Sequence, residues 1–189
     1  MCGKYHVSTE EENIEMRDYL AKALASQSPI AVRSGDIVPS LASPIITSDT
    51  VEPMVFGIKL SSVQRLVINA RSETAHQSPL YAPMLEETRC MVPVTAFYEW
   101  NKEKKPFLFY PEGAKNMFLA GLYKLQESIP RFVILTRPAN ETVAAVHHRM
   151  PLILPSAEFR DAWLQSAQLA REILSIPQDI PLDMRRASA

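Results

Sequence analysis

Arg-Cys-Met-Val-Pro-Val-Thr-Ala-Phe-Tyr-Glu-Trp-Asn, residues 89–101, is the stretch that decides the fold class of this chain. Its β-branched and aromatic side chains are typical of strands, and similar runs follow at 106–110, 117–122 and 131–136. Helical patterns lie at the ends of this strand series and do not alternate with its members. The sequence therefore predicts an α+β fold and not an alternating α/β fold.

Helices are expected on both sides of the strand series. Ser8 and Glu11 have the spacing of a capping box, and the apolar side chains after them predict a helix to about Ala25. Short strands are also expected at 44–47, 54–58 and 66–68. Further helices are expected at 79–88 and 166–175, and two more should begin at the N-caps Asn140 and Ser156.

Composition limits the classes of protein that this chain can belong to. Hydrophobic residues make up 47% and charged residues 22%, which is ordinary for a soluble globular protein. The formal net charge of −1 argues against a broadly basic surface, so nucleic acid would need a local basic cleft. There is no apolar run of about 18 residues and no signal-peptide pattern, so we expect a cytoplasmic protein without a membrane segment.

Cys2 is the residue with the most distinctive chemical potential. Removal of Met1 would give Cys2 a free α-amine next to its thiol, and such groups titrate at about pH 8 and about pH 8.5. Together they can condense with an aldehyde, first to an imine and then to a thiazolidine ring. Cys90 has no comparable context and is expected to be a buried strand residue, so the two cysteines make no disulfide framework.

Four motifs occur in a characteristic order along the chain. They are Met1-Cys2-Gly3, Asn-Ala-Arg-Ser-Glu-Thr at 69–74, Phe-Tyr-Glu-Trp at 97–100, and His-His-Arg-Met-Pro at 147–151. This series resembles the SRAP (SOS response-associated peptidase) family over residues 1 to about 155. The resemblance implies one domain over 1–189, with the motifs in a core at 1–155 and a helical region at 156–189. It also implies a mixed, mostly antiparallel, curved or barrel-like sheet with peripheral helices.

The resemblance implies a sensor of abasic sites in single-stranded DNA. Such proteins link their N-terminal cysteine covalently to the ring-opened deoxyribose, and they are thought to remove their own leading methionine. We accordingly expect abasic single-stranded DNA as the partner, no cofactor or metal, a monomer, and association with the nucleoid when DNA is bound. Two alternatives remain open: a cysteine peptidase that acts only on itself or on peptides, and a non-covalent module for single-stranded or modified DNA.

The candidate catalytic residues are Cys2, Asn69, Glu99 and His147. Strand alternation places Glu99 on the face opposite Trp100, where apolar neighbours can raise the pKa of its carboxyl and suit it to move protons. Taken alone, Glu99 is better read as a solvent-facing strand residue, and it is the resemblance that favours the proton-moving role. By resemblance, His147 is preferred over His148 as the histidine that moves a proton when the sugar ring opens.

Asn69, Arg71 and Glu73 share one face if their motif is a strand. The Asn69 amide could then bond the Cys2 amine or a sugar hydroxyl. Arg71 has a planar fork suited to a phosphate, and Glu73 is expected to be its structural partner. The alternative is an exposed polar face that is paired only with its neighbours.

Five residues are expected to contact DNA. Lys4, Arg71 and Arg149 would hold phosphates, although Lys4 lacks the bidentate geometry of arginine. Phe56 could stack on a base, and Trp100 is a further candidate contact.

Overall fold

The computed structural model of the protein describes residues 2–60, 65–177 and 180–187. The strands are β1 (Tyr5–Val7), β2 (Gly35–Ile37), β3 (Ala42–Ile46), β4 (Val51–Phe56), β5 (Ile58–Leu60), β6 (Arg65–Val67), β7 (Asn69–Arg71), β8 (Arg89–Val94), β9 (Ala96–Trp100), β10 (Pro106–Pro111), β11 (Met117–Gln126), β12 (Ile129–Pro138), β13 (Arg149–Pro151), β14 (Ile153–Leu154) and β15 (Leu182–Arg186). The helices are α1 (Ile14–Ala25), α2 (Ala82–Glu87), α3 (Glu141–Ala144), α4 (Ala157–Gln165) and α5 (Ala167–Ser175), with a 3-10 turn η1 (Ala75–Gln77).

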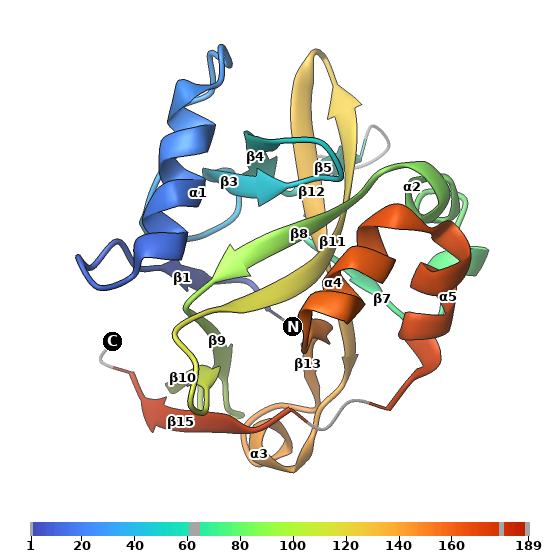
Figure 1. The fold of residues 1–189 in the computed structure, drawn as a ribbon. Helices are drawn as coiled ribbons and strands as arrows, with labels where there is room; N and C mark the ends of the chain where they lie inside the picture. The colour runs from blue at the N-terminus through green and yellow to red at the C-terminus, as the bar shows by residue number, and fades with distance from the viewer. Residues whose placement is uncertain (1, 61–64, 178–179, 188–189) are drawn as a thin grey trace.

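Five strands close on themselves to form a barrel. β12 pairs with β4, β4 with β3, β3 with β8, β8 with β11, and β11 with β12 again. The β12–β4 pairing is parallel and the other four are antiparallel. Figure 1 shows this barrel with α1 on one side and α2, α4 and α5 on the other. The predicted single α+β domain with a mixed, mostly antiparallel, barrel-like sheet and peripheral helices is confirmed.

A second sheet brings the start of the chain against β9. Its strand order is β15-β10-β9-β1-β2, and Tyr5 of β1 lies opposite Phe97 of β9. The hydroxyl of Tyr5 also lies 2.5 Å from that of Ser43 on β3, which ties this sheet to the barrel. The segment that carries Cys2 is therefore held between two sheets.

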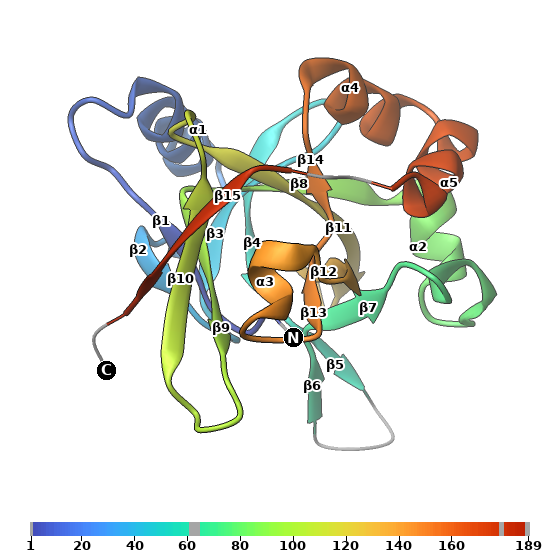
Figure 2. The same cartoon turned by 90° about the horizontal axis from the view of Figure 1, so that it is seen from below.

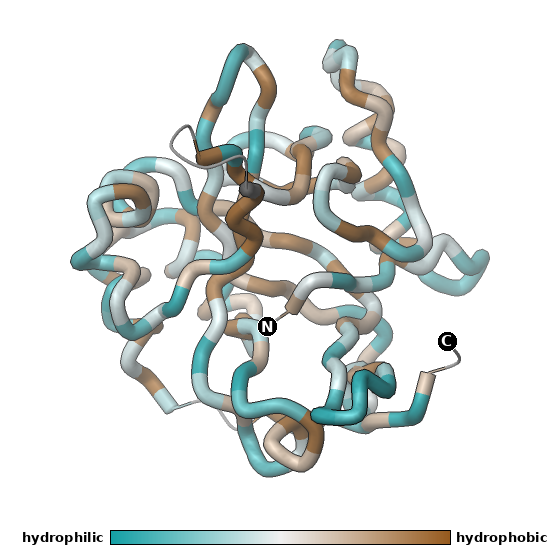
Figure 3. The backbone as a smooth tube through the Cα atoms, turned by 180° about the vertical axis from the view of Figure 1, so that it is seen from behind, coloured by the Kyte–Doolittle hydropathy of each residue, from teal (hydrophilic) through white to brown (hydrophobic). Residues whose placement is uncertain are grey.

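The barrel interior is filled by apolar side chains, and Figure 3 shows hydrophobic segments along its central strands. Phe56 belongs to this core, with none of its surface exposed. Its ring stacks on Phe132 with centroids 5.2 Å apart and makes a T-shaped contact with Tyr5, with centroids 5.6 Å apart. The prediction that Phe56 stacks on a base is wrong in this structure, because the Phe56 side chain is fully buried among other aromatic side chains.

Replacing Phe56 with alanine is expected to destabilise the fold. Removal of a fully buried aromatic ring leaves a cavity, so the free energy of unfolding should fall by about 3–5 kcal/mol. Urea denaturation followed by circular dichroism measures this change. Val38→Ala is the control, because Val38 is 39% exposed and should change the free energy of unfolding by less than about 1 kcal/mol. An unchanged urea midpoint for Phe56→Ala would show that this ring does not support the core.

The first helix begins later than its capping-box pattern predicts. The side chain of Asn13 accepts a hydrogen bond from the backbone N–H of Met16, so α1 starts at Ile14 and the predicted cap at Ser8 is wrong. The predicted end at Ala25 is confirmed. The predicted N-cap at Asn140 is also confirmed, since its side chain accepts from the N–H of Val143 at 3.0 Å.

The helical region expected at 156–189 is only partly helical. α4 and α5 form as predicted, and the indole N–H of Trp163 donates to the carbonyl of Cys90 at 2.9 Å, which fastens α4 to β8. β15 then pairs with β10 at the edge of the second sheet. This pairing satisfies backbone groups of β10 that an uncovered edge strand would leave without partners. None of the helices in the described residues is long and apolar enough to cross a membrane.

Candidate active site around Cys2

Cys2 lies immediately before β1 and is fully buried. Its thiol donates to the carbonyl of Lys4 at 3.8 Å, and its own carbonyl accepts from the side-chain amide of Asn69 at 3.1 Å. Burial raises the pKa of the Cys2 thiol well above its usual range, and the nearby carboxylate of Glu99 raises it further. The sulfur is therefore held as a neutral thiol at neutral pH.

Glu99 is the buried carboxyl of the site. The alternation predicted for β9 is confirmed, because Phe97 and Glu99 are buried while Tyr98 and Trp100 are partly exposed. Burial raises the pKa of Glu99 to about 7. A carboxyl in that range can both accept and release a proton near neutral pH.

His147 is brought to Glu99 from the turn between α3 and β13. Its ring Nδ1 lies 3.6 Å from Glu99 Oε2, and the backbone N–H of Arg149 donates to the same nitrogen at 3.1 Å. The ring of His148 lies 4.5 Å from that of His147 but is exposed, and the neighbouring His147 lowers its pKa. Of the two histidines, the structure thus places His147 against the buried carboxyl.

Asn69 reaches the site from β7, which runs parallel to β12 with Asn69 opposite Ile134. Its amide nitrogen contacts the carbonyls of Cys2 and Ile134, at 3.1 and 3.4 Å. Its Oδ1 is buried and has no hydrogen-bond partner among the described residues. A buried acceptor next to Cys2 is therefore open to a donor that the described residues do not supply.

Four segments far apart in the sequence supply these groups: the start of the chain before β1, the strands β7 and β9, and the turn between α3 and β13. Figure 2 shows β7, β9 and β13 at one end of the molecule, with the β9–β10 and β5–β6 hairpins extending beside them. The predicted catalytic residues Cys2, Asn69, Glu99 and His147 are all brought together there. Among the described residues, no cluster of three or more His, Cys, Asp or Glu side chains has an arrangement that would hold a metal ion.

The two arginines of the motifs have different surroundings. Arg71 is exposed at the end of β7, whereas Arg149 is 8% exposed and its guanidinium bonds Glu73 and Thr136. Glu73 pairs with Arg149, so the expected pairing of Glu73 with Arg71 is wrong. The reason is that β7 ends at Arg71 and the chain then turns, which removes Glu73 from the strand face.

Lys4 and Trp100 lie on a partly exposed strip beside Cys2. The ammonium of Lys4 is 2.7 Å from Asp36 Oδ2 and 4.3 Å from the centroid of the Tyr98 ring. The rings of Tyr98 and Trp100 are 6.2 Å apart. Lys4 is thus already paired with a carboxylate, while Trp100 keeps part of its ring accessible. Asp36 was not a sequence candidate, because only the pairing of β1 with β2 brings it to Lys4.

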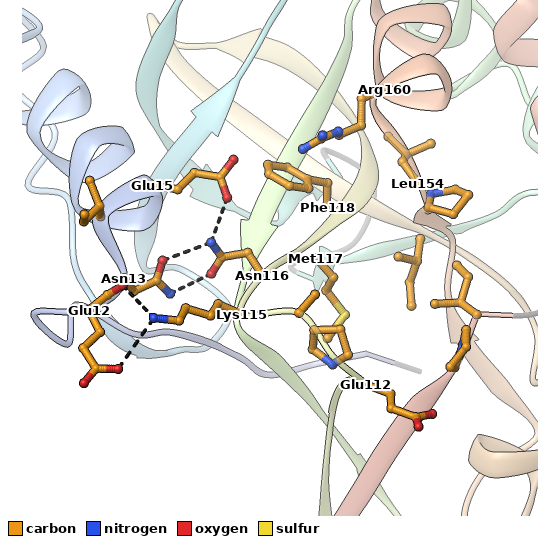
Figure 4. Close-up of a pocket in the computed structure, with 17 residues that line it drawn as sticks. Glu12, Asn13, Glu15, Glu112, Lys115, Asn116, Met117, Phe118, Leu154 and Arg160 are labelled. Atoms are coloured by element: carbon orange, nitrogen blue, oxygen red, sulfur yellow. Dashed lines mark hydrogen bonds and ion pairs between the residues drawn. The ribbon is translucent and has the colours of Figure 1, made fainter.

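A cavity of about 610 Å³ lies elsewhere, between the start of α1, the start of β11 and the start of α4 (Figure 4). Its polar groups are largely bonded to one another: Asn13 to Asn116, and Lys115 to Glu12. None of the predicted site residues lines it. The Cys2 cluster, where buried titratable groups converge, is therefore the candidate site.

Comparison with known proteins places the chain in a family. The model described as SOS response associated peptidase (SRAP) matches residues 1–188, and the chain belongs to this family. "Abasic site processing protein HMCES" of Gallus gallus is 30% identical over 61% of this chain and 43% of that protein. "Abasic site processing protein YoqW" of Bacillus subtilis is 34% identical over 52% of this chain and 47% of that protein. The chain spans about half the length of the curated relatives it matches.

Solved structures share the fold. A crystal structure of a protein from Bordetella bronchiseptica superposes with a TM-score of 0.78 at 22% identity and covers 100% of both chains. At that level of identity the likeness establishes the architecture alone.

Proposed function

We propose that this protein recognises abasic sites in single-stranded DNA and links itself to them through Cys2 after Met1 has been removed. The observation that carries the proposal is the convergence of Glu99, His147 and Asn69 on a buried Cys2. The names of its relatives, which are abasic site processing proteins, support the same substrate.

The reaction converts an aldehyde and an aminothiol into a thiazolidine and one water. While Met1 is attached, the Cys2 nitrogen is an amide and cannot react in this way. Once free, the amine adds to C1′ of the ring-opened deoxyribose, and loss of water gives an imine. The Cys2 sulfur then forms a bond to the imine carbon, and its proton passes to the nitrogen. Because burial keeps the thiol neutral, the amine is expected to attack first.

Glu99 and His147 have the positions needed for the proton transfers. The carboxyl of Glu99, with its pKa near neutrality, would take a proton from the Cys2 ammonium and return one to the departing water. His147, at the edge of the buried pair, would assist the opening of the sugar ring. The unpartnered Oδ1 of Asn69 would accept a hydrogen bond from the amine or from a sugar hydroxyl.

DNA contacts would come from groups at the rim of the site. Arg71 is exposed and has the fork geometry that suits a phosphate. Trp100 offers a partly exposed ring for a base, and Lys4 could exchange its bond with Asp36 for a phosphate. Single bases stacked on an aromatic side chain favour an unpaired strand over a duplex.

The test is incubation of Met1-free protein with a single strand whose one uracil has been converted to an abasic site. Mass spectrometry should find protein and DNA joined with the loss of one water, in a product that survives denaturation by heat. A protein that binds the strand without gaining mass would be a non-covalent module. Met1-free protein that neither binds nor reacts with the strand would leave autoprocessing or peptidase activity as the alternative. Either result would overturn the proposal.

A further inference from the structure

Asp36 is a charged carboxylate at the rim of the candidate site. It lies on β2, where the pairing with β1 sets it opposite His6. Among the described residues, three donors converge on it: Lys4 Nζ lies 2.7 Å from Oδ2, while His6 Nδ1 and the Tyr98 hydroxyl lie 2.7 and 3.1 Å from Oδ1. Partial burial raises the pKa of Asp36, but its bonds with the three side chains outweigh that effect and hold the pKa below its usual range. Asp36 is therefore negatively charged at neutral pH.

The side chain of Lys4 is held in place by this carboxylate. Its ammonium also lies 4.3 Å from the centroid of the Tyr98 ring, which adds a cation–π contact. The Lys4 side chain is 28% exposed, against 41% for Asp36. The positive charge of Lys4 is thus neutralised by a neighbour that is more open to solvent. A phosphate that approaches the ammonium meets the Asp36 carboxylate as well.

The backbone of Lys4 is held independently of its side chain. Its carbonyl accepts a hydrogen bond from the backbone N–H of Tyr98 at 2.9 Å and contacts the Cys2 thiol at 3.8 Å. These contacts place the start of the chain against β9 whether or not the ammonium is bonded. Loss of the Asp36 charge should therefore release the Lys4 side chain without moving Cys2.

The bond between Lys4 and Asp36 can be exchanged for a bond to a phosphate. An ion pair whose partners are both partly exposed contributes little to stability, so a second anion can replace the carboxylate. His6 and Tyr98 would still bond Asp36 Oδ1 after the exchange, so the carboxylate would keep hydrogen-bond partners. Its negative charge would nevertheless stay beside the phosphate and weaken the new contact.

We propose that Asp36 sets the affinity of this protein for DNA by competing with the phosphates for Lys4. The inference rests on the proposed function for the identity of the anion. It gives Asp36 a role opposite to that of a phosphate ligand, because the charge of Lys4 then adds little to the reversible binding of any strand. Lasting attachment depends on the covalent bond at Cys2, which forms only at an abasic site.

Binding of an undamaged single strand tests this competition. Asp36→Asn keeps the size of the side chain and removes its charge, so the Kd measured by fluorescence anisotropy at 0.1 M salt should fall by about 3-fold or more. The plot of log affinity against log salt should become steeper by about 0.7, as expected for one more phosphate contact. Asp18→Asn is the matched control, because it removes the same charge from an exposed pair with Lys22 on α1. It should change neither quantity.

Two other results would overturn the competition. If the carboxylate instead holds Lys4 where a phosphate needs it, Asp36→Asn should bind the strand more weakly than the wild-type protein. If Asp36 instead positions Cys2 through Lys4, the Kd should stay the same and the maximal crosslinking rate should fall. The competition predicts a tighter Kd with an unchanged maximal rate.

A readout without DNA separates this inference from the proposed function. Only the uncharged amine of a lysine reacts with an acylating reagent, and a nearby carboxylate favours the charged form. The acylation rate of Lys4, followed by mass spectrometry of its peptide, should therefore rise several-fold in Asp36→Asn, while that of Lys22 stays constant. Equal Lys4 rates in both proteins would overturn the inference, whatever the DNA experiments show. A faster rate in a protein that binds no strand would instead overturn the proposed function, and with it the role of Asp36 toward DNA.

Discussion

Cys2→Ala is expected to abolish the covalent product with abasic DNA, with a loss of more than about 1000-fold in crosslinking rate. The substitution removes the sulfur that closes the ring, so only a reversible imine can form. A time course on a denaturing gel, with Met1 removal verified by mass spectrometry, measures this loss. Binding to an undamaged strand should be unaffected, because the thiol is buried and points to the carbonyl of Lys4.

Cys90→Ala is the matched control for this experiment. Cys90 is equally buried, but it lies on β8 close to Gly121 and belongs to the core. We expect a small loss of stability and no loss of crosslinking. A heat-stable product that persists in Cys2→Ala and disappears in Cys90→Ala would reverse the assignment.

Glu99→Gln is expected to slow crosslinking by about 100-fold or more at neutral pH, since an amide cannot exchange protons. The wild-type rate should rise through a pH near 7, where the Glu99 carboxyl loses its proton, and this limb should be missing in the variant. Single-turnover rates between pH 5 and pH 9 measure both effects. Glu103→Gln is the control, because Glu103 is exposed at the hairpin after β9 and pairs with Lys105, outside the candidate site.

The same substitution should stabilise the folded protein at alkaline pH. Because burial raises the pKa of Glu99 from 4.5 to about 7, the folded state keeps a proton that the unfolded chain releases. Stability therefore falls as the pH rises through this window. Above it the charged carboxylate costs up to about 3 kcal/mol, which glutamine avoids. Chemical denaturation at pH 5 and pH 8 should show a gain for Glu99→Gln mainly at pH 8. An equal gain at both values would contradict the raised pKa.

Local patterns in the sequence predicted much of the fold. The α+β class, the strands β8 to β12 and the cap at Asn140 depend on side chains near each other in the chain, and all of them are present in the structure. The capping box at Ser8 failed because Asn13 offers a competing cap closer to the apolar stripe. β15 was not anticipated, because a polar segment becomes a strand there only through pairing with β10.

The sequence by itself determined the candidate reactive groups of this protein, because the chemistry open to a cysteine, a glutamate or a histidine depends on the residue type and the motifs mark their places. It also determined which face of β9 Glu99 occupies, since alternation along a strand is local. Only the tertiary structure decided that Phe56 is core, that His147 rather than His148 faces Glu99, and that Glu73 holds Arg149. Burial and pairing of this kind depend on contacts between segments that are far apart in the chain and meet only when the barrel closes.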